Sequence, residues 1–221
     1  DRKVKRLLKQ WDKVSVEISK IPKNKKIILY PLQMQPEANL DVWGNSYRNQ
    51  ANLIREIACI IPSDWIVVVK TNPKSKYEMS SELLHVLEVE QNVVALDRTV
   101  GMREIFTLSD LIATVTGTIA IEAVLSGKPL ALFGTSVVSQ VNGVKAITKY
   151  DQLKDLINEI ENNSFKLAQK EDKRELIHKM MTTSYSGIVS DPATDPNCLL
   201  EDNINAIYNA LKELLAMDRD K

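Results

Sequence analysis

Short apolar runs alternate with amphipathic segments along most of the chain, and this alternation predicts the fold. Buried strands are predicted at residues 26–31, 65–70, 93–96, 111–115 and 129–133. Helices are predicted between them, at residues 47–60, 80–90, 102–108 and 119–126. The strongest strand, Trp65–Lys70, holds an almost unbroken β-branched run, which is typical of a parallel sheet covered on both faces.

Strands that alternate with helices at this spacing predict an α/β fold with a doubly wound, Rossmann-like parallel sheet. A polar amphipathic helix is expected over residues 1–20, and the chain beyond Gly143 is expected to be mostly helical, at residues 150–161, 166–181 and 201–217. The predicted organisation is an N-terminal helix and linker at 1–22, a Rossmann-like domain at 23–149, and a helical C-terminal extension at 150–221.

Composition narrows the classes of function. Among the 221 residues, 29 Lys and Arg balance 29 Asp and Glu, so no global field attracts nucleic acid or an anionic membrane. The apolar runs are too short to cross a bilayer, and the charged first residues do not resemble a signal peptide. Cys59 and Cys198 have no CxxC partner, which argues against a disulfide framework or a zinc site. We therefore expect a cytoplasmic protein, with the inner face of the membrane as an alternative location. We also expect the chain, which lacks an initiating Met, to be part of a longer polypeptide.

The turn Thr116-Gly117-Thr118 is the main candidate for ligand chemistry. It follows a predicted strand and begins a predicted helix, and ligands of open α/β sheets bind outside the carboxyl ends of the strands. Gly117 permits close approach of a ligand, and the helix N-terminus offers free N–H groups to a phosphate. Glu122 lies one helical turn beyond Thr118 and is suited to accept the hydroxyls of a ribose. Local chemistry leaves an alternative open, in which Thr118 caps the helix and Glu122 is a solvated or capping side chain.

The histidines and carboxylates give no sign of a metal site. His85 and His178 lie in ordinary amphipathic helices, and the sequence contains neither an HExxH motif nor a clustered carboxylate motif. We therefore expect no required metal and no cofactor other than a nucleotide-linked donor.

Two segments resemble a known family. VTGTIAIEAVLSGKPLALFG is similar to the donor-binding strand, turn, helix and strand of GT-B glycosyltransferases. YPLQMQPEANLDVWG resembles the Gln-Pro-Glu region of the capsular polysaccharide biosynthesis proteins, which include bacterial β-Kdo transferases that use CMP-Kdo. The resemblance implies the C-terminal, donor-binding half of a GT-B enzyme.

The resemblance also implies roles for individual residues. The turn would hold the donor phosphate and Glu122 the ribose, while Gln35 and Glu37 would address the transferred sugar, Glu37 as a base or by orienting it. Without the resemblance, Glu37 is more simply a turn residue after Pro36. Proteins of this family usually carry His-Pro after the second strand, whereas this chain has Asn72-Pro73, with Lys70 just before. Asn72 could donate a hydrogen bond and Lys70 could offset phosphate charge, but neither replaces an imidazole.

The leading functional hypothesis is transfer of Kdo, or a similar acidic sugar, from a CMP-linked donor to a glycan or glycolipid acceptor during bacterial surface polysaccharide synthesis. The acceptor would dock mainly on the N-terminal GT-B half or a partner domain. A UDP-sugar transferase or a CDP-polyol polymerase is the second hypothesis, because GT-B donor halves are alike. The third is a degenerate, non-catalytic scaffold domain, which the substitution of histidine by Asn72 motivates.

Overall fold

The computed structural model describes residues 2–35, 39–71 and 79–219. Its contacts divide the chain into two compact units, Asp1–Lys173 and Arg174–Lys221, which we call the sheet unit and the C-terminal unit. The boundary falls within helix α7 (Lys170–Thr182). Among the described residues, no helix is both long enough and apolar enough to span a membrane.

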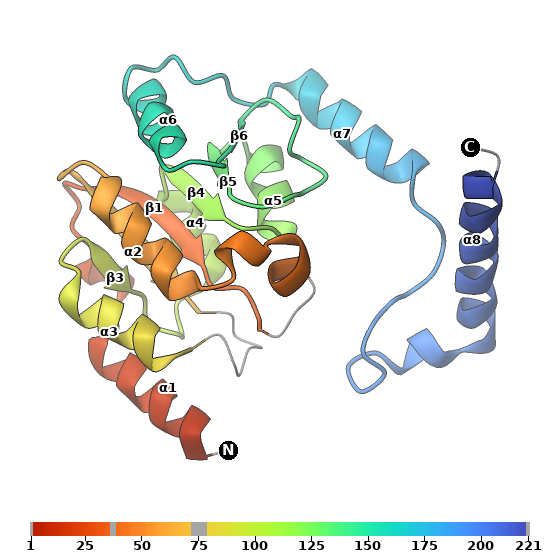
Figure 1. Ribbon diagram of the computed structural model, residues 1–221, viewed down its shortest axis with the longest axis horizontal. Coiled ribbons are helices and arrows are strands. Elements are labelled where there is room, and N and C mark those ends of the chain that lie inside the picture. The colour runs from red at the N-terminus through yellow and green to blue at the C-terminus, as the bar shows by residue number, and fades with distance from the viewer. Residues whose placement is uncertain (1, 36–38, 72–78, 220–221) are drawn as a thin grey trace. The chain divides into compact units, whose positions relative to one another are not determined.

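The sheet unit is built on one parallel sheet, which confirms the doubly wound α/β fold (Figure 1). In the order β3-β2-β1-β4-β5-β6, its described strands are Val93–Ala95, Trp65–Lys70, Lys26–Pro31, Leu111–Thr114, Leu130–Leu132 and Val144–Ala146. All neighbouring strands pair in parallel. The chain steps outward from β1 to β3, returns to place β4 beside β1, and then steps outward on the other side. The point between β1 and β4, where the direction of winding reverses, is the topological switch point.

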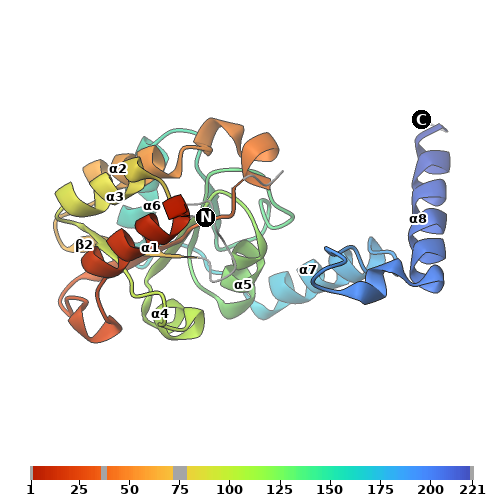
Figure 2. The ribbon, with the colours of Figure 1, turned by 90° about the horizontal axis from the view of Figure 1, so that it is seen from below.

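Helices cover both faces of this sheet (Figure 2). The helices α2, α3 and α6 lie over one face, and α4 and α5 lie over the other. Their bounds, after the N-terminal α1 (Arg2–Val14), are Gln50–Ile60 for α2, Ser81–Val89 for α3, Met102–Leu108 for α4, Thr118–Ser126 for α5 and Asp151–Glu161 for α6. Short 3₁₀ turns at Ile18–Lys20 and Asn45–Tyr47 and a π-helical turn at Asn39–Trp43 complete the described connections of the sheet unit.

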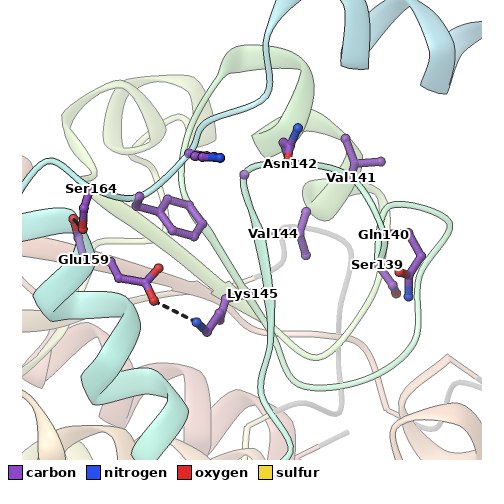
Figure 3. Close-up of a pocket in the computed structure, with 11 residues that line it drawn as sticks. Ser139, Gln140, Val141, Asn142, Val144, Lys145, Glu159 and Ser164 are labelled. Atoms are coloured by element: carbon purple, nitrogen blue, oxygen red, sulfur yellow. Dashed lines mark hydrogen bonds and ion pairs between the residues drawn. The ribbon is translucent and has the colours of Figure 1, made fainter.

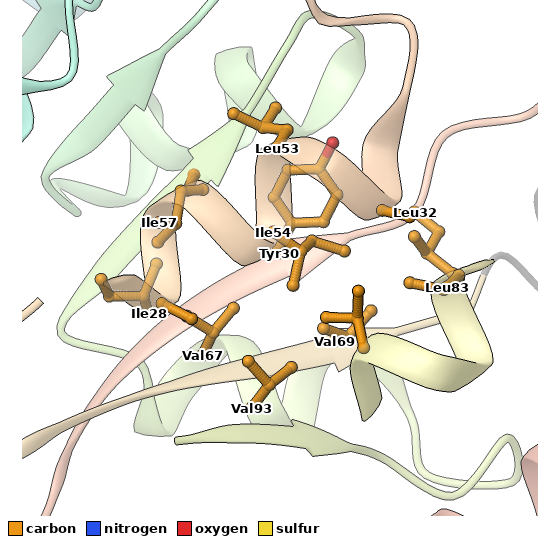
Figure 4. Close-up of a cluster of buried hydrophobic side chains, with 14 of the residues drawn as sticks. Ile28, Tyr30, Leu32, Leu53, Ile54, Ile57, Val67, Val69, Leu83 and Val93 are labelled. Carbon is orange, nitrogen blue, oxygen red and sulfur yellow. The ribbon is translucent and has the colours of Figure 1, made fainter. Parts of the chain in front are cut away.

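The core explains why the predicted strands form where they do. Every residue of Trp65–Lys70 is buried, as expected of an inner strand of a sheet that has helices over both faces. Tyr30 of β1 lies among α2 side chains, as Figure 4 shows for Leu53, Ile54 and Ile57. Complete burial of one large apolar side chain contributes roughly 1.5–3 kcal/mol to the stability of the fold. The sheet is therefore held mainly by apolar packing against its two helical layers.

The N-terminal helix packs within the sheet unit. Trp11 is fully buried, and its indole N–H donates to the carbonyl of Leu96 at 3.1 Å. Beyond α1, the N–H of Val16 donates to the carbonyl of Ala95 at 2.9 Å, and the carbonyl of Val16 accepts from the N–H of Asp97 at 2.9 Å. This single parallel bridge lies along the outer edge of β3.

Three features differ from the predictions. The chain beyond Gly143 first forms strand β6, Val144–Ala146, rather than continuing into helix. Its three residues, Val144 to Ala146, are too few for their alternation to predict a strand, and they form one by pairing with β5. Helix α1 ends at Val14, before the 3₁₀ turn, and α7 begins at Lys170 rather than at residue 166.

The C-terminal unit contains the last part of α7, a 3₁₀ turn (Pro196–Leu199) and helix α8 (Glu201–Arg219). Asn203 of α8 organises the loop before it. Its Nδ2 donates to the carbonyls of Ile188 and Cys198, each at 2.9 Å, and its Oδ1 accepts from the N–H of Ile188 at 2.6 Å. One side chain thus fixes two points of a loop that has little secondary structure of its own.

Gly134, two residues after the end of β5, leads to a prediction about stability. Its N–H donates to the carbonyl of Val115 at 2.8 Å, and a Cβ at this position would lie 2.6 Å from that oxygen. Because the obstacle is backbone, we expect Gly134→Ala to lower the free energy of unfolding by about 3 kcal/mol in urea denaturation.

The matched control is Gly101→Ala, where the nearest atom is the end of the flexible Glu104 side chain, at 3.1 Å. We expect this variant to lose at most about 1 kcal/mol, since Gly101 is a helix N-cap. Equal losses in the two variants would show that the Val115 carbonyl yields easily.

Candidate functional site

The candidate site lies at the carboxyl edge of the sheet, at the switch point between β1 and β4. Loops that leave two such strands run apart and open a crevice where ligands of doubly wound proteins bind. The chain leaves β1 through Leu32 and Gln33 and leaves β4 through Thr116 and Gly117. These two loops are 83 residues apart in sequence, yet a hydrogen bond from the Gln33 Nε2 to the Thr116 carbonyl joins them.

Gly117 begins helix α5. Its φ of 97° lies in the region that favours glycine, and it occupies the N-cap position without a side-chain capping bond. The alternative prediction that Thr118 caps this helix is therefore wrong, because Thr118 is already the first helical residue. In this described part of the chain, the N-cap residue Gly117 offers no side chain to the first N–H groups of α5, so these groups can donate hydrogen bonds to an anion.

Thr116 is fixed from both sides. Its carbonyl accepts from the hydroxyl of Thr114 at 2.8 Å and from Gln33, and its own hydroxyl donates to the carbonyl of Thr135 at 3.0 Å. Because C=O and N–H point in opposite directions across a trans peptide, this inward carbonyl turns the N–H of Gly117 outward. Thr116 thus offers a ligand an oriented backbone, while its hydroxyl proton is donated within the protein.

Thr118 and Glu122 both have exposed side chains on α5. They are four residues apart, so they lie one above the other on the same helical face. The phosphate and ribose positions that the sequence predicts are therefore on one accessible strip of the helix.

Gln35 lies in the loop after β1, and its amide is already engaged. Its Nε2 donates to Oδ1 of Asp41 at 3.3 Å and to the carbonyl of Arg48 at 3.0 Å, and its Oε1 accepts from Gln50 at 3.1 Å. Both amide hydrogens have acceptors within the protein, so a ligand would meet the remaining lone pair of Oε1. The other predicted residues of this region, Glu37 and Asn72, lie outside the described residues.

Lys70 ends β2, one strand away from the switch point. It is only 2% exposed, and its ammonium donates to the carbonyl of Arg98 at 3.0 Å. Burial lowers the pKa of Lys70, while the nearby Asp97 carboxylate acts in the opposite direction. The described contacts therefore bring Gln33, Thr116 and Gly117 together and direct Lys70 toward the loop after β3.

Two residues at the site were not predicted from the sequence, Gln33 and Gln50. The only feature of the sequence that marks Gln33 as a candidate is that it is the first polar residue after β1. Gln50, at the start of α2, is 3% exposed, and its amide binds both the N–H and the carbonyl of Gln33, at 2.8 and 2.9 Å. Gln33 reaches Thr114 and Thr116 because β4 lies beside β1, and Gln50 reaches Gln33 because α2 packs against β1, so both sets of contacts arise from tertiary structure.

Two cavities of the sheet unit lie elsewhere. One, of about 460 Å³, lies between residues 139–145 and 164–166, where Lys145 pairs with Glu159 at 2.9 Å (Figure 3). The other, of about 580 Å³, is lined mainly by residues 21–27 at the amino ends of the strands, with Asp110. Neither of these two cavities is lined by the turn at Thr116 and Gly117.

Metal ligands do not gather within the described part of the chain. No group of three or more His, Cys, Asp and Glu residues there could hold a metal ion. The available chemistry of the described site is therefore that of backbone amides, a helix terminus, amide side chains and one exposed carboxylate.

Fold and site together define a doubly wound α/β protein with Rossmann strand order and, at its switch point, a helix N-terminus whose N-cap residue is a glycine. Residues 2–185 match the model of a family described as capsule polysaccharide biosynthesis protein, and the chain belongs to this family. No curated protein matches the chain.

Solved structures share the fold at low identity. UDP-GlcNAc 2-epimerase from Neisseria meningitidis, bound to UDP-GlcNAc, matches with a TM-score of 0.50 and 15% identity, over 82% of this chain and 50% of that one. KpsC of Thermosulfurimonas dismutans, a β-Kdo 2,7 transferase, matches with a TM-score of 0.47 and 17% identity, over 80% of this chain and 60% of that one. The chain thus spans between half and three fifths of the length of these two proteins.

The buried Lys70 gives a prediction about pH. Burial lowers its pKa below the ordinary 10.5, so the unfolded chain binds more protons than the folded chain as pH approaches that value. The free energy of unfolding of the wild type should therefore rise relative to that of Lys70→Met between neutral pH and 10.5. Urea denaturation at a series of pH values measures this difference, and a difference that is independent of pH would contradict it.

Proposed function

We propose that this protein is the donor-binding part of a glycosyltransferase of bacterial surface polysaccharide synthesis. The observation that carries the proposal is the uncapped N-terminus of α5, which follows Gly117 at the switch point. In a member of the capsule polysaccharide biosynthesis family, an anion site at this position suits the phosphate of a nucleotide sugar.

In the proposed reaction, the nucleotide phosphate leaves as the sugar is transferred. The outward N–H of Gly117 and the N-terminus of α5 would stabilise the charge that develops on this leaving group. Such stabilisation needs no metal, and we propose that none is required. Glu122, exposed one turn along the helix, would accept the ribose hydroxyls.

For the donor, we propose CMP-Kdo or a related CMP-linked acidic sugar, supported by the resemblance around Gln35, Pro36 and Glu37. Glu37 would address the transferred sugar, and Lys70 and Asn72 would lie toward the nucleotide side of the cleft. UDP-sugars are the main alternative, since the Neisseria epimerase of similar fold is bound to UDP-GlcNAc. A CDP-polyol is a further alternative.

For the acceptor, we propose a glycan or glycolipid bound mainly by an N-terminal half or a partner domain. The proposal is supported by the length of the chain, which spans 50–60% of the two solved proteins described above. The place of action would be the cytoplasm, with the inner face of the membrane as the alternative.

Calorimetric titration with CMP, UDP and GDP tests the nucleotide site. We expect one of these nucleotides to bind, and Glu122→Ala to weaken it about 10- to 100-fold, the loss expected for charge-assisted hydrogen bonds. Glu88→Ala removes a carboxylate that is also exposed, on α3, and should leave the affinity unchanged. Absence of nucleotide binding, or an affinity that Glu122→Ala does not alter, would overturn the proposal.

Donor turnover separates an enzyme from a scaffold, the candidate that Asn72 in place of the usual histidine favours. We expect the full-length protein to release nucleotide from CMP-Kdo, by transfer or hydrolysis, and Glu37→Ala to slow this release by about 100-fold or more. Chromatography of the nucleotide product measures the rate. Nucleotide binding without any release by the wild type would favour the scaffold.

A further inference from the structure

The side chain of Gln50 has partners at both ends of its amide. Its Oε1 accepts from the N–H of Gln33 at 2.8 Å and from the hydroxyl of Tyr30 at 3.4 Å. Its Nε2 donates to the carbonyl of Gln33 at 2.9 Å and to Oε1 of Gln35 at 3.1 Å. A buried amide with both hydrogens donated and its oxygen shared has one orientation, so Gln50 holds Gln33 and Gln35 in one arrangement.

Gln33 links the loop after β1 to the end of β4 and the turn that follows it, on the other side of the switch point. Its Nε2 donates to the hydroxyl of Thr114 at 3.1 Å and to the carbonyl of Thr116. The orientation of the amide follows from this contact, because a carbonyl oxygen only accepts and must therefore face the NH₂ group. The Oε1 of Gln33 is buried and has no partner among the described residues, which is an uncommon cost for an amide that only fills space.

The amide of Gln33 lies directly beneath the turn. A Cβ added to Gly117 would lie 3.3 Å from the Gln33 Nε2, so the glycine allows the turn to approach this close. Gln33 fixes the direction of the Thr116 carbonyl. The N–H of Gly117 belongs to the same trans peptide and therefore points in the opposite direction. The helical N–H of Ala120 donates to the carbonyl of Gly117 at 3.1 Å, which links the turn to α5.

We propose that Gln50 is a positioning residue of the donor site. Through its hydrogen bonds to Gln33, it directs the Gly117 N–H toward the donor phosphate. Through its hydrogen bond to Gln35, it fixes the position of Gln35 relative to this turn. The identity of the ligand rests on the proposed function, whereas the coupling from α2 to the turn does not.

A comparison of CMP with cytidine tests the phosphate site, because the two ligands differ only in the phosphate. If UDP binds more tightly than CMP, UDP and uridine are compared instead. We expect Gln50→Met and Gln33→Met to weaken nucleotide binding about tenfold, as the loss of a well-aimed hydrogen bond to a charged group predicts. Binding of the nucleoside, measured by ligand-observed NMR, should not change, because it lacks the phosphate. An equal loss for nucleotide and nucleoside would indicate general loosening and overturn the proposal, as would no loss for either.

Amide hydrogen exchange without ligand gives a second readout. We expect the Ala120 N–H to exchange about tenfold faster in Gln50→Met and Gln33→Met, although Ala120 contacts neither side chain through a hydrogen bond. The matched control is Gln152→Met, since Gln152 accepts from the N–H groups of Thr148 and Lys149, at 2.7 and 3.0 Å, in another loop of the sheet unit. This control should change neither exchange at Ala120 nor nucleotide binding.

The outcomes separate the two proposals. If the wild type binds no nucleotide, the proposed function fails, and exchange at Ala120 still decides whether Gln50 fixes the turn. If the wild type binds nucleotide and both Met variants behave like Gln152→Met, the positioning role fails alone. If Gln50→Met does not fold, Gln33→Met decides, because Gln33 is less deeply buried than Gln50.

Discussion

The pairing of β1 with β4 is the constraint on which the site depends. These strands pair in parallel through Ile28 with Leu111 and Leu29 with Ile112, and their carboxyl ends therefore meet at one edge of the sheet. The chain then turns toward one face after β1 and toward the other after β4. Residues far apart in sequence come within hydrogen-bonding distance only because of this pairing, and the loops that carry them separate just beyond it.

Recognition of an anion by this site would depend on the orientation of backbone N–H groups more than on the net charge of the protein. The chain carries equal numbers of basic and acidic residues, and the ammonium of Lys70 is engaged with a carbonyl next to β3. Oriented N–H groups at a helix terminus attract a phosphate over a short range and require it to approach along one line. A site of this kind loses its selectivity when the turn is misoriented, even if no charge is removed, which gives the amides beneath the turn their importance.

The sequence was sufficient for the parts of the structure that local patterns encode. Apolar runs located β1 to β5, and the glycine between a strand and a helix located the turn at Gly117, because both depend on nearest neighbours in the chain. It was insufficient for β6, whose three residues become a strand by pairing with β5. It also missed Gln33 and Gln50, since a glutamine after a strand has no periodic signature and acquires its partners from tertiary structure.

The two outer strands of the sheet have a consequence for association between copies of the protein. A strand at a sheet edge can template further strands, and proteins prevent this with short edges, charged side chains or a covering segment. The edge at β3 is bridged by Val16, and the edge at β6 has three residues with Lys145 paired to Glu159 at 2.9 Å. Both edges of a strongly apolar sheet thus carry features that disfavour the addition of a further strand, and growth into aggregates with it.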